Sequence, residues 1–344
     1  MYEMKKIFSL FLIIILLVGC SKKDDKRVLN VLNWSSYIPS DVLLNFEKET
    51  GIKVNYMTYS SNEELLAKIS MAKPGTYDLI FPSDYMVEIM INRGMIELID
   101  KSRLKNIDNL DNEYMNMSYD PDNLYTLPFI ATSTVISVNR EFISDEIDSY
   151  NDLLNPDYKG EIALIDDQRI IIGMALLANG FDMNSTNSTE LRVAKNWLLK
   201  LKDNVKAYDS DSPKNFLISK EVSLAVLWNA EGALANFENN NIENIFPSEG
   251  VALSTDNFAI PVGAENKQEL YEFIDYILRP EVMAKIIKFY PYKSINSLSY
   301  QYLDDEYKEN TAANFSSDVV KSGHFVKNIG ESISLYDKVW AEIK

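Results

Sequence analysis

The stretch VLNVLNWSSYIPSDVLLNFEKETGIKVNY, residues 28–56, decides the fold. Its first residues, 28–33, predict a strand, and residues 39–50 have the spacing of an amphipathic helix. Gly51 supplies the stop for that helix, and residues 52–56 alternate as a strand does. A strand, a helix and a second strand in this order indicate two parallel strands with the helix packed on one face of their sheet.

The same order continues with a helix over residues 62–71, a strand over 77–81 and a helix ending at Arg93. In parallel sheets of this kind, ligands bind beyond the carboxyl ends of the strands. The loops that follow the first and third strands, residues 34–37 and 82–85, are polar and aromatic. We therefore expect both loops at a binding edge of an α/β domain.

A second unit of strands and helices follows. The predicted strands are 134–138, 161–166, 222–227 and 257–262, and the predicted helices are 169–178, 189–202, 267–278 and 329–343. The residues beyond the N-terminal leader, about 320 of them, exceed what one ordinary core organises, so we expect two domains.

The N-terminus has the pattern of a bacterial lipoprotein leader. Lys5 and Lys6 precede a short apolar run over residues 7–18, and Cys20 is the only cysteine among 344 residues. We expect a signal peptide over 1–19, a lipid on Cys20 and a tether over 20–27. This predicts an exported protein anchored to the cell membrane, on its periplasmic or extracellular face.

Composition excludes several other classes. One cysteine forms no internal disulfide, and a single histidine, His324, argues against a zinc or iron–sulfur site, so we expect no metal and no cofactor. A net charge of −17 repels nucleic acid and attracts cations. No nucleophile elbow or phosphate-binding glycine loop occurs, so a non-enzymatic role is favoured.

Aromatic side chains recur beside acids where predicted strands end. The set is Trp34 with Tyr37, Asp84 with Tyr85, Asp166 with Asp167, Trp228 with Glu231, then Asp256 and Tyr292. Together they fit a slot with flat aromatic walls and carboxylates along it. Such a slot suits a thin, flexible ligand with several ammonium groups, whose methylenes stack on rings while its charges meet ring faces and carboxylates.

At these residues the chain resembles the spermidine/putrescine-binding proteins of bacterial polyamine importers, over nearly the whole mature length. The matching stretches are LNWSSYIP at 32–39, FEKETGIKV at 46–54, YDLIFPS at 77–83, GMI at 94–96, PDYKG at 156–160, LWN at 227–229 and LRPEV at 278–282. The resemblance implies a two-lobed periplasmic-binding-protein-like α/β fold with crossover strands between the lobes. It also implies permease and ATPase subunits of an ABC transporter as partners.

The resemblance further implies lobe boundaries and roles for side chains. Lobe 1 would comprise 28–133 and 257–299, lobe 2 would comprise 134–256 and 300–344, and crossovers would lie near 131–134, 256–257 and 298–301. Trp34, Tyr37 and Trp228 would be aromatic walls with Tyr85 and Tyr292 beside them, Asp167 and Asp256 would pair with ammonium groups, and Ser35, Ser83 and Ser210 would add hydroxyl contacts.

The chain departs from the family pattern at four positions. Ile170 stands in place of a Glu, Ser254 in place of a Trp, Ser36 in place of an acid common in spermidine binders, and Val326 in place of a Gln. Glu231 matches an acid used by putrescine-preferring relatives, and Asp84 is a second acid that could compensate. The sequence thus indicates an amine of the putrescine or spermidine class without choosing between them.

Three alternatives stay open at this point. A protein of the same fold could bind another amine, a sugar or an amino acid. An Arg or Lys in the slot would favour an anionic ligand; Arg169 is the candidate, and it could equally be a structural partner of Asp166 or Asp167. A surface lipoprotein hydrolase could use paired carboxylates among Asp166, Asp167 and Glu231. A ligand-free adhesin or sensor would need no closed slot.

Overall fold

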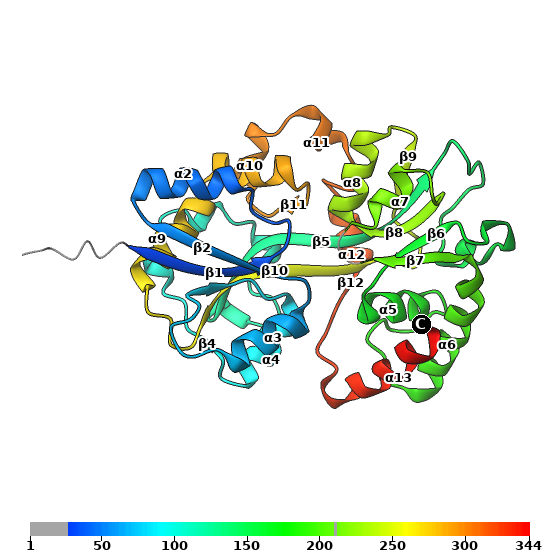
Figure 1. The fold of residues 1–344 in the computed structure, drawn as a ribbon, viewed down its shortest axis with the longest axis horizontal. Coiled ribbons are helices and arrows are strands. Elements are labelled where there is room, and N and C mark those ends of the chain that lie inside the picture. The colour runs from blue at the N-terminus through cyan, green and yellow to red at the C-terminus, as the bar shows by residue number, and fades with distance from the viewer. Residues whose placement is uncertain (1–26, 210–211) are drawn as a thin grey trace, which may run out of the picture.

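The computed structural model describes residues 27–209 and 212–344. The predicted signal peptide, the tether up to residue 26, Cys20 and Ser210 lie outside the described residues. Within the described part, the chain folds into two α/β lobes joined by long strands (Figure 1). None of its helices there has the length and apolar character needed to cross a bilayer.

The strands are β1 Val28–Trp34, β2 Lys53–Tyr59, β3 Leu79–Ile80, β4 Ile96–Glu97, β5 Thr126–Asn139, β6 Ile162–Ile165, β7 Val205–Asp209, β8 Leu224–Trp228, β9 Ile242–Ile245, β10 Ala252–Pro261, β11 Lys293–Ser294 and β12 His324–Phe325. The α-helices are α2 Ser40–Thr50, α3 Asn62–Met71, α4 Asp84–Asn92, α5 Gln168–Leu177, α6 Ser188–Leu201, α7 Lys214–Ile218, α8 Asn229–Glu238, α9 Lys267–Ile277, α10 Pro280–Phe289, α11 Asp305–Glu309, α12 Ser317–Ser322 and α13 Ile333–Ile343. Short 3₁₀ helices are Lys101–Arg103, Ile107–Asn109, Asn112–Tyr114, Pro121–Asn123, Tyr150–Leu154, Pro156–Tyr158, Lys202–Asn204, Ser297–Tyr302 and Gly330–Ser332.

The main sheet of the described residues has the strand order β2-β1-β3-β10-β5-β8-β6-β7. Strands β2, β1 and β3 are parallel in lobe 1, and β7, β6 and β8 are parallel in lobe 2, as the strand–helix order predicts. Strand β10 is antiparallel to β3 and to β5, and β5 is antiparallel to β8. The sheet is therefore mixed, with two parallel halves separated by an antiparallel pair.

That central pair, β5 and β10, runs from one lobe into the other (Figure 1). Every residue of both strands is buried. Pattern analysis predicts shorter strands, at 134–138 and 257–262, because the buried first half of β10 carries the polar run Ser254-Thr255-Asp256-Asn257. Because other parts of the chain cover both faces of these strands, their residues do not alternate between apolar and polar as those of a half-exposed strand do.

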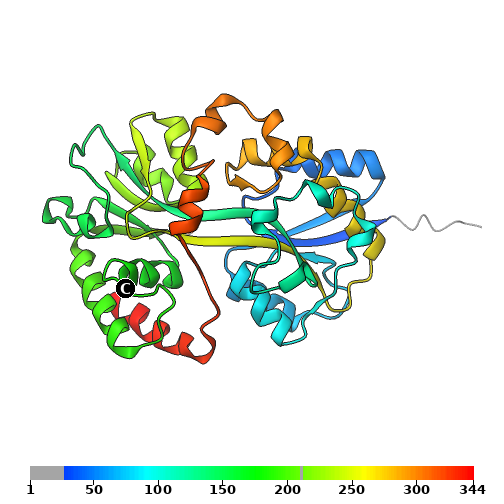
Figure 2. The same ribbon diagram turned by 180° about the vertical axis from the view of Figure 1, so that it is seen from behind.

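Helices cover both faces of each half of the sheet. In lobe 1, α2, α9 and α10 lie on one face and α3 and α4 on the other (Figures 1 and 2). In lobe 2, α7 and α8 lie on one face and α5, α6 and α13 on the other. This layering places the apolar core against the sheet and leaves the strand ends that face the opposite lobe free to carry polar side chains.

The C-terminal part differs from the sequence prediction in two ways. The third crossover expected near 298–301 is instead the 3₁₀ helix Ser297–Tyr302, which packs on α10. The chain stays with lobe 1 until Tyr307, whose hydroxyl donates to the carbonyl of Tyr292 at 2.7 Å, and reaches lobe 2 at Asn310, whose amide donates to Asn236 at 2.9 Å. We propose that lobe 1 comprises residues 28–133 and 257–309, with the rest of the described chain in lobe 2.

The last helix is also shorter than predicted. It begins at Ile333 rather than Ile329, because Gly330 adopts a positive φ of 56° that an α-helix does not accommodate.

Candidate ligand-binding site

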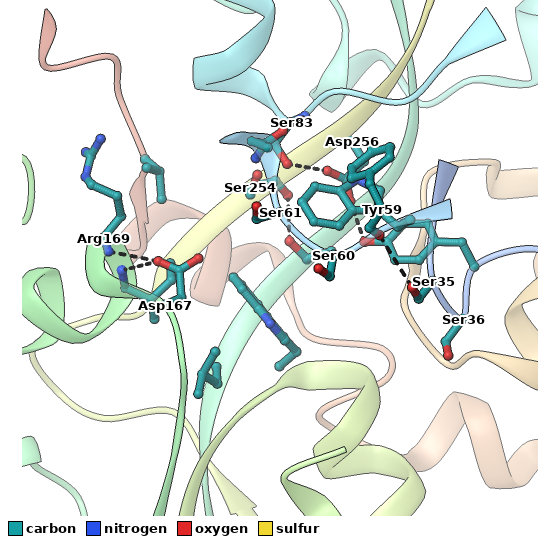
Figure 3. Close-up of a pocket in the computed structure, with 18 of the residues that line it drawn as sticks. Ser35, Ser36, Tyr59, Ser60, Ser61, Ser83, Asp167, Arg169, Ser254 and Asp256 are labelled. Carbon is teal, nitrogen blue, oxygen red and sulfur yellow. Dashed lines mark hydrogen bonds between the residues drawn. The ribbon is translucent and has the colours of Figure 1, made fainter. Parts of the chain in front are cut away.

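A cavity of about 440 Å³ lies between the lobes, where strands of both halves end (Figure 3). Lobe 1 contributes the segments after β1 and β2 and the start of α4, and lobe 2 contributes the segments after β6 and β8. The lining residues are Trp34, Ser35, Ser36, Tyr37, Tyr59, Ser60, Ser61, Asn62, Glu63, Ser83, Tyr85, Thr132, Ile165, Asp166, Asp167, Arg169, Ile170, Ser212, Trp228, Glu231, Ser254, Asp256, Tyr292 and Val326.

Aromatic rings form one wall of this cavity. Trp34 stacks on Tyr37 with centroids 6.1 Å apart and planes at 28°, and Tyr292 lies 4.9 Å from Tyr37. The indole N–H of Trp34 donates to the carbonyl of Phe81 at 2.9 Å, which fixes the ring orientation. Trp228 is the last residue of β8 in lobe 2, where it pairs with Thr134 of β5, and it lines the cavity from that side. Both lobes thus present a ring to the space between them.

Asp256 is the most enclosed acid of the lining, with 2% of its surface exposed. Its carboxylate accepts hydrogen bonds from the hydroxyls of Tyr37, at 2.5 Å, and Ser83, at 2.6 Å (Figure 3). Burial raises the pKa of Asp256 to about 6, although both hydroxyl donors favour the ionised form. An ammonium group placed here would restore the solvation that burial removed.

Asp167 faces the cavity from lobe 2. Its carboxylate caps α5 and accepts from the backbone N–H groups of Arg169 at 2.8 Å and Ile170 at 3.1 Å. Burial raises the pKa of Asp167, and the hydrogen bonds from these two backbone amides lower it in part. The capping bonds hold the carboxylate in place at the end of β6.

Arg169 is the single arginine or lysine in the lining formed by the described residues. Its guanidinium donates to the carbonyl of Lys327 at 2.9 Å and to Asn184 at 3.0 Å. It also lies over the rings of Tyr85 and Tyr336, at 5.7 and 5.1 Å from their centroids. Figure 3 shows the side chain extending away from the carboxylate of Asp167 and from Asp256. Arg169 therefore ties together parts of the protein, and its guanidinium already donates two hydrogen bonds within the chain.

Most of the predicted site residues come together here. Ten of them line the cavity: Trp34, Ser35, Tyr37, Ser83, Tyr85, Asp167, Trp228, Glu231, Asp256 and Tyr292. The four positions that depart from the family pattern, Ser36, Ile170, Ser254 and Val326, line it as well. Ser210 lies outside the described residues.

Asp84 does not line the cavity. It is 2% exposed and lies behind Ser254, whose hydroxyl donates to it at 3.1 Å. Burial raises the pKa of Asp84 to about 8, and the backbone N–H of Tyr85 gives it a hydrogen bond at 2.8 Å. The expectation that Asp84 compensates directly for a missing carboxylate is therefore not supported by its position.

Sequence reasoning missed a whole segment of the lining. Tyr59 and residues 60–63 follow β2, which we predicted to end at Tyr56 but which continues to Tyr59. The rule that drew attention to the loops after β1 and β3 applies equally to β2, so a correct strand end would have revealed them.

Comparison with known proteins agrees with this architecture. Residues 42–314 match the model of a family described as bacterial extracellular solute-binding protein. The chain belongs to that family. Over 328 residues it is 36% identical to the spermidine/putrescine-binding periplasmic protein of Escherichia coli K12, covering 95% of this chain and 94% of that one.

Solved structures give the same result. A spermidine/putrescine ABC transporter substrate-binding protein, PotD of Streptococcus pneumoniae, superimposes with a TM-score of 0.81 at 28% identity, covering 92% of this chain and 98% of the other. The Tp0655 (TpPotD) lipoprotein of Treponema pallidum gives 0.82 at 25% identity, covering 92% and 99%. These likenesses confirm the two-lobed solute-binding fold expected from the sequence.

Proposed function

We propose that this protein captures a polyamine of the putrescine or spermidine class between its lobes and delivers it to an ABC importer. One observation carries the proposal: the cavity joins two carboxylates to aromatic rings of both lobes. Asp256 is bonded to Tyr37 and Ser83 of lobe 1, and Asp167 caps α5 in lobe 2. The E. coli relative with the spermidine/putrescine-binding name spans nearly the whole chain and supports the ligand class.

The proposed role needs no chemical step. An alkyl diamine places its methylenes on Trp34 and Trp228 while its ends meet the two carboxylates. Because the ligand contacts both lobes only when they are close, binding shifts the population towards a closed form. That closed form is the one we expect to dock on permease subunits, with an ATPase supplying energy for import.

A sugar, a neutral amino acid or an anion fits the lining less well. Carboxyl side chains outnumber the single guanidinium in the part of the lining that the structure describes, and Arg169 is already bonded to Lys327 and Asn184. The matched family consists of solute-binding proteins, which favours binding over the hydrolase alternative.

Export and anchoring are the second part of the proposal. The leader ending at Cys20 has the composition of a lipoprotein signal, and the Treponema pallidum structural relative is a lipoprotein. A lipid on Cys20 would hold the lobes close to the membrane where the permease resides.

Calorimetric titration of the chain lacking its signal peptide tests the ligand class. Putrescine, cadaverine, spermidine and agmatine are compared with 4-aminobutyrate, which keeps one ammonium group and replaces the other with a carboxylate. Binding of at least one polyamine at micromolar concentration, with no binding of 4-aminobutyrate, is expected. Absence of heat from all four amines, measured in two buffers, would reject the proposal.

A further inference from the structure

Glu231, which matches a ligand-binding acid of putrescine-preferring relatives, forms an ion pair with a lysine of the protein itself. Lys214, the first residue of α7, places its ammonium 2.9 and 3.0 Å from the two carboxylate oxygens of Glu231, in the first turn of α8. The two side chains are 15% and 16% exposed, and α7 packs against α8. The pair is therefore held by two packed helices and largely shielded from water.

The other enclosed acids of the lining differ from Glu231 in this respect. Asp256 is bonded to hydroxyl groups and Asp167 to backbone amides, and neither forms an ion pair with a lysine or arginine of residues 27–209 and 212–344. Asp166 pairs with Lys344 at 2.6 Å, and Glu63 is exposed to solvent, where its charge is screened. Asp167 and Asp256 are thus the enclosed carboxylates still available to neutralise a ligand.

A ligand ammonium arriving at Glu231 would compete with Lys214. Both oxygens already contact one cation, so a second gains less, and displacing Lys214 would leave a largely buried ammonium without its counterion. The ammonium group of Lys214 thus makes the contact with Glu231 that an additional ammonium group of the ligand would otherwise make.

We propose that Lys214 is a specificity-determining residue, an internal ammonium that neutralises Glu231 and sets the slot to prefer a diamine over a longer triamine. This inference rests on the proposed polyamine function. The two enclosed carboxylates match the two ends of a diamine, whereas the third ammonium of a triamine finds no unpaired enclosed acid among the described residues.

Titrations with putrescine and spermidine on charge variants test the inference. Lys214→Met removes the charge, and Lys214→Gln removes it while keeping a hydrogen-bond donor for Glu231. We expect both to raise the affinity for spermidine relative to putrescine by about tenfold, since Glu231 becomes free to form a charge-assisted hydrogen bond. The matched control is Lys206→Met, which makes the same charge change at a side chain 42% exposed in lobe 2 and should leave the ratio unaltered.

A reciprocal variant completes the cycle. Glu231→Gln leaves Lys214 uncompensated beside the cavity, so both amines should bind more weakly than to the wild type. The double variant Lys214→Met/Glu231→Gln restores local neutrality, so its ratio of spermidine affinity to putrescine affinity should equal that of the wild type. Because it contains no unpaired charge, it also reports on the slot if a single variant folds poorly.

The outcomes separate the two ideas. A wild-type chain that binds neither amine refutes the proposed function and this inference with it. A wild-type chain that binds an amine, with the spermidine-to-putrescine ratio unchanged within twofold in both Lys214 variants, refutes the role of Lys214 and leaves the proposed function standing.

Discussion

Replacing Asp256 with asparagine should separate ligand binding from folding stability. In the proposed complex, a ligand ammonium lies against a carboxylate that is 2% exposed. Removing one partner of such an enclosed pair costs about 3–5 kcal/mol, which corresponds to a loss of affinity of about a hundredfold or more. Asparagine keeps the size of the side chain, so its effect reports the charge.

The same substitution should weaken ligand binding but increase the stability of the ligand-free protein. Burial raises the pKa of Asp256 from 3.8 to about 6, so the folded state favours the protonated form more than the unfolded state does. The folded protein therefore loses stability as pH rises from about 4 through about 6, and at pH 7 the penalty is roughly 3 kcal/mol. Asp256→Asn removes that penalty, so the unfolding temperature at pH 7 should rise by a few degrees.

The assay combines calorimetric titration with putrescine and thermal unfolding of the same samples at pH 7. Asp318→Asn is the control, because it makes the same charge change at a side chain 90% exposed. An affinity within twofold of the wild type would remove Asp256 from the site. Weaker binding accompanied by a fall in unfolding temperature would show that asparagine disrupts the fold, contrary to the electrostatic reasoning.

Other predictions follow from the same cavity. Trp228→Ala should weaken putrescine binding about tenfold through loss of a ring face, and an unchanged dissociation constant would place the ligand elsewhere. Asp84→Asn should change affinity less than threefold, because a group behind Ser254 with a pKa of about 8 is mostly neutral at pH 7; a hundredfold loss would contradict this. Affinity should rise by up to about tenfold per pH unit below pH 6 as Asp256 ionises and level off by pH 7, and a flat profile from pH 5 to 7 would argue against ionised Asp256 as the partner. Cys20→Ala should move the protein from the detergent to the aqueous phase in a Triton X-114 partition, whereas identical partitioning would argue against a lipid anchor.

The fold was predictable where each strand has a helix beside it and an apolar face. Residues 28–56 alone indicated the parallel unit that the structure contains as β1, α2 and β2. Only the second half of the long strand β10 was predicted, because the first half carries buried polar residues, among them Asp256 and Ser254 at the cavity. Such residues contradict local pattern rules, and their partners come from distant parts of the chain: Tyr37 and Ser83 for Asp256, and Asp84 for Ser254.

The site was predictable as a set of strand ends but not as an electrostatic arrangement. Sequence placed Glu231 and Asp84 near the slot as compensating acids. Only three-dimensional packing shows that Lys214, seventeen positions earlier than Glu231, neutralises it, and that Ser254 separates Asp84 from the cavity. Pairings between helices and across strands have no signature in local sequence, so the number of available carboxylates had to come from the structure.

Native mass spectrometry of the exported protein tests the central claim most directly. The chain is purified from its own cells without added ligand and measured again after addition of putrescine. We predict that the first spectrum shows the protein with one bound polyamine, or that the second shows the protein with one bound putrescine. A co-purified sugar or carboxylic acid, or a bare protein mass that putrescine does not change, would contradict it.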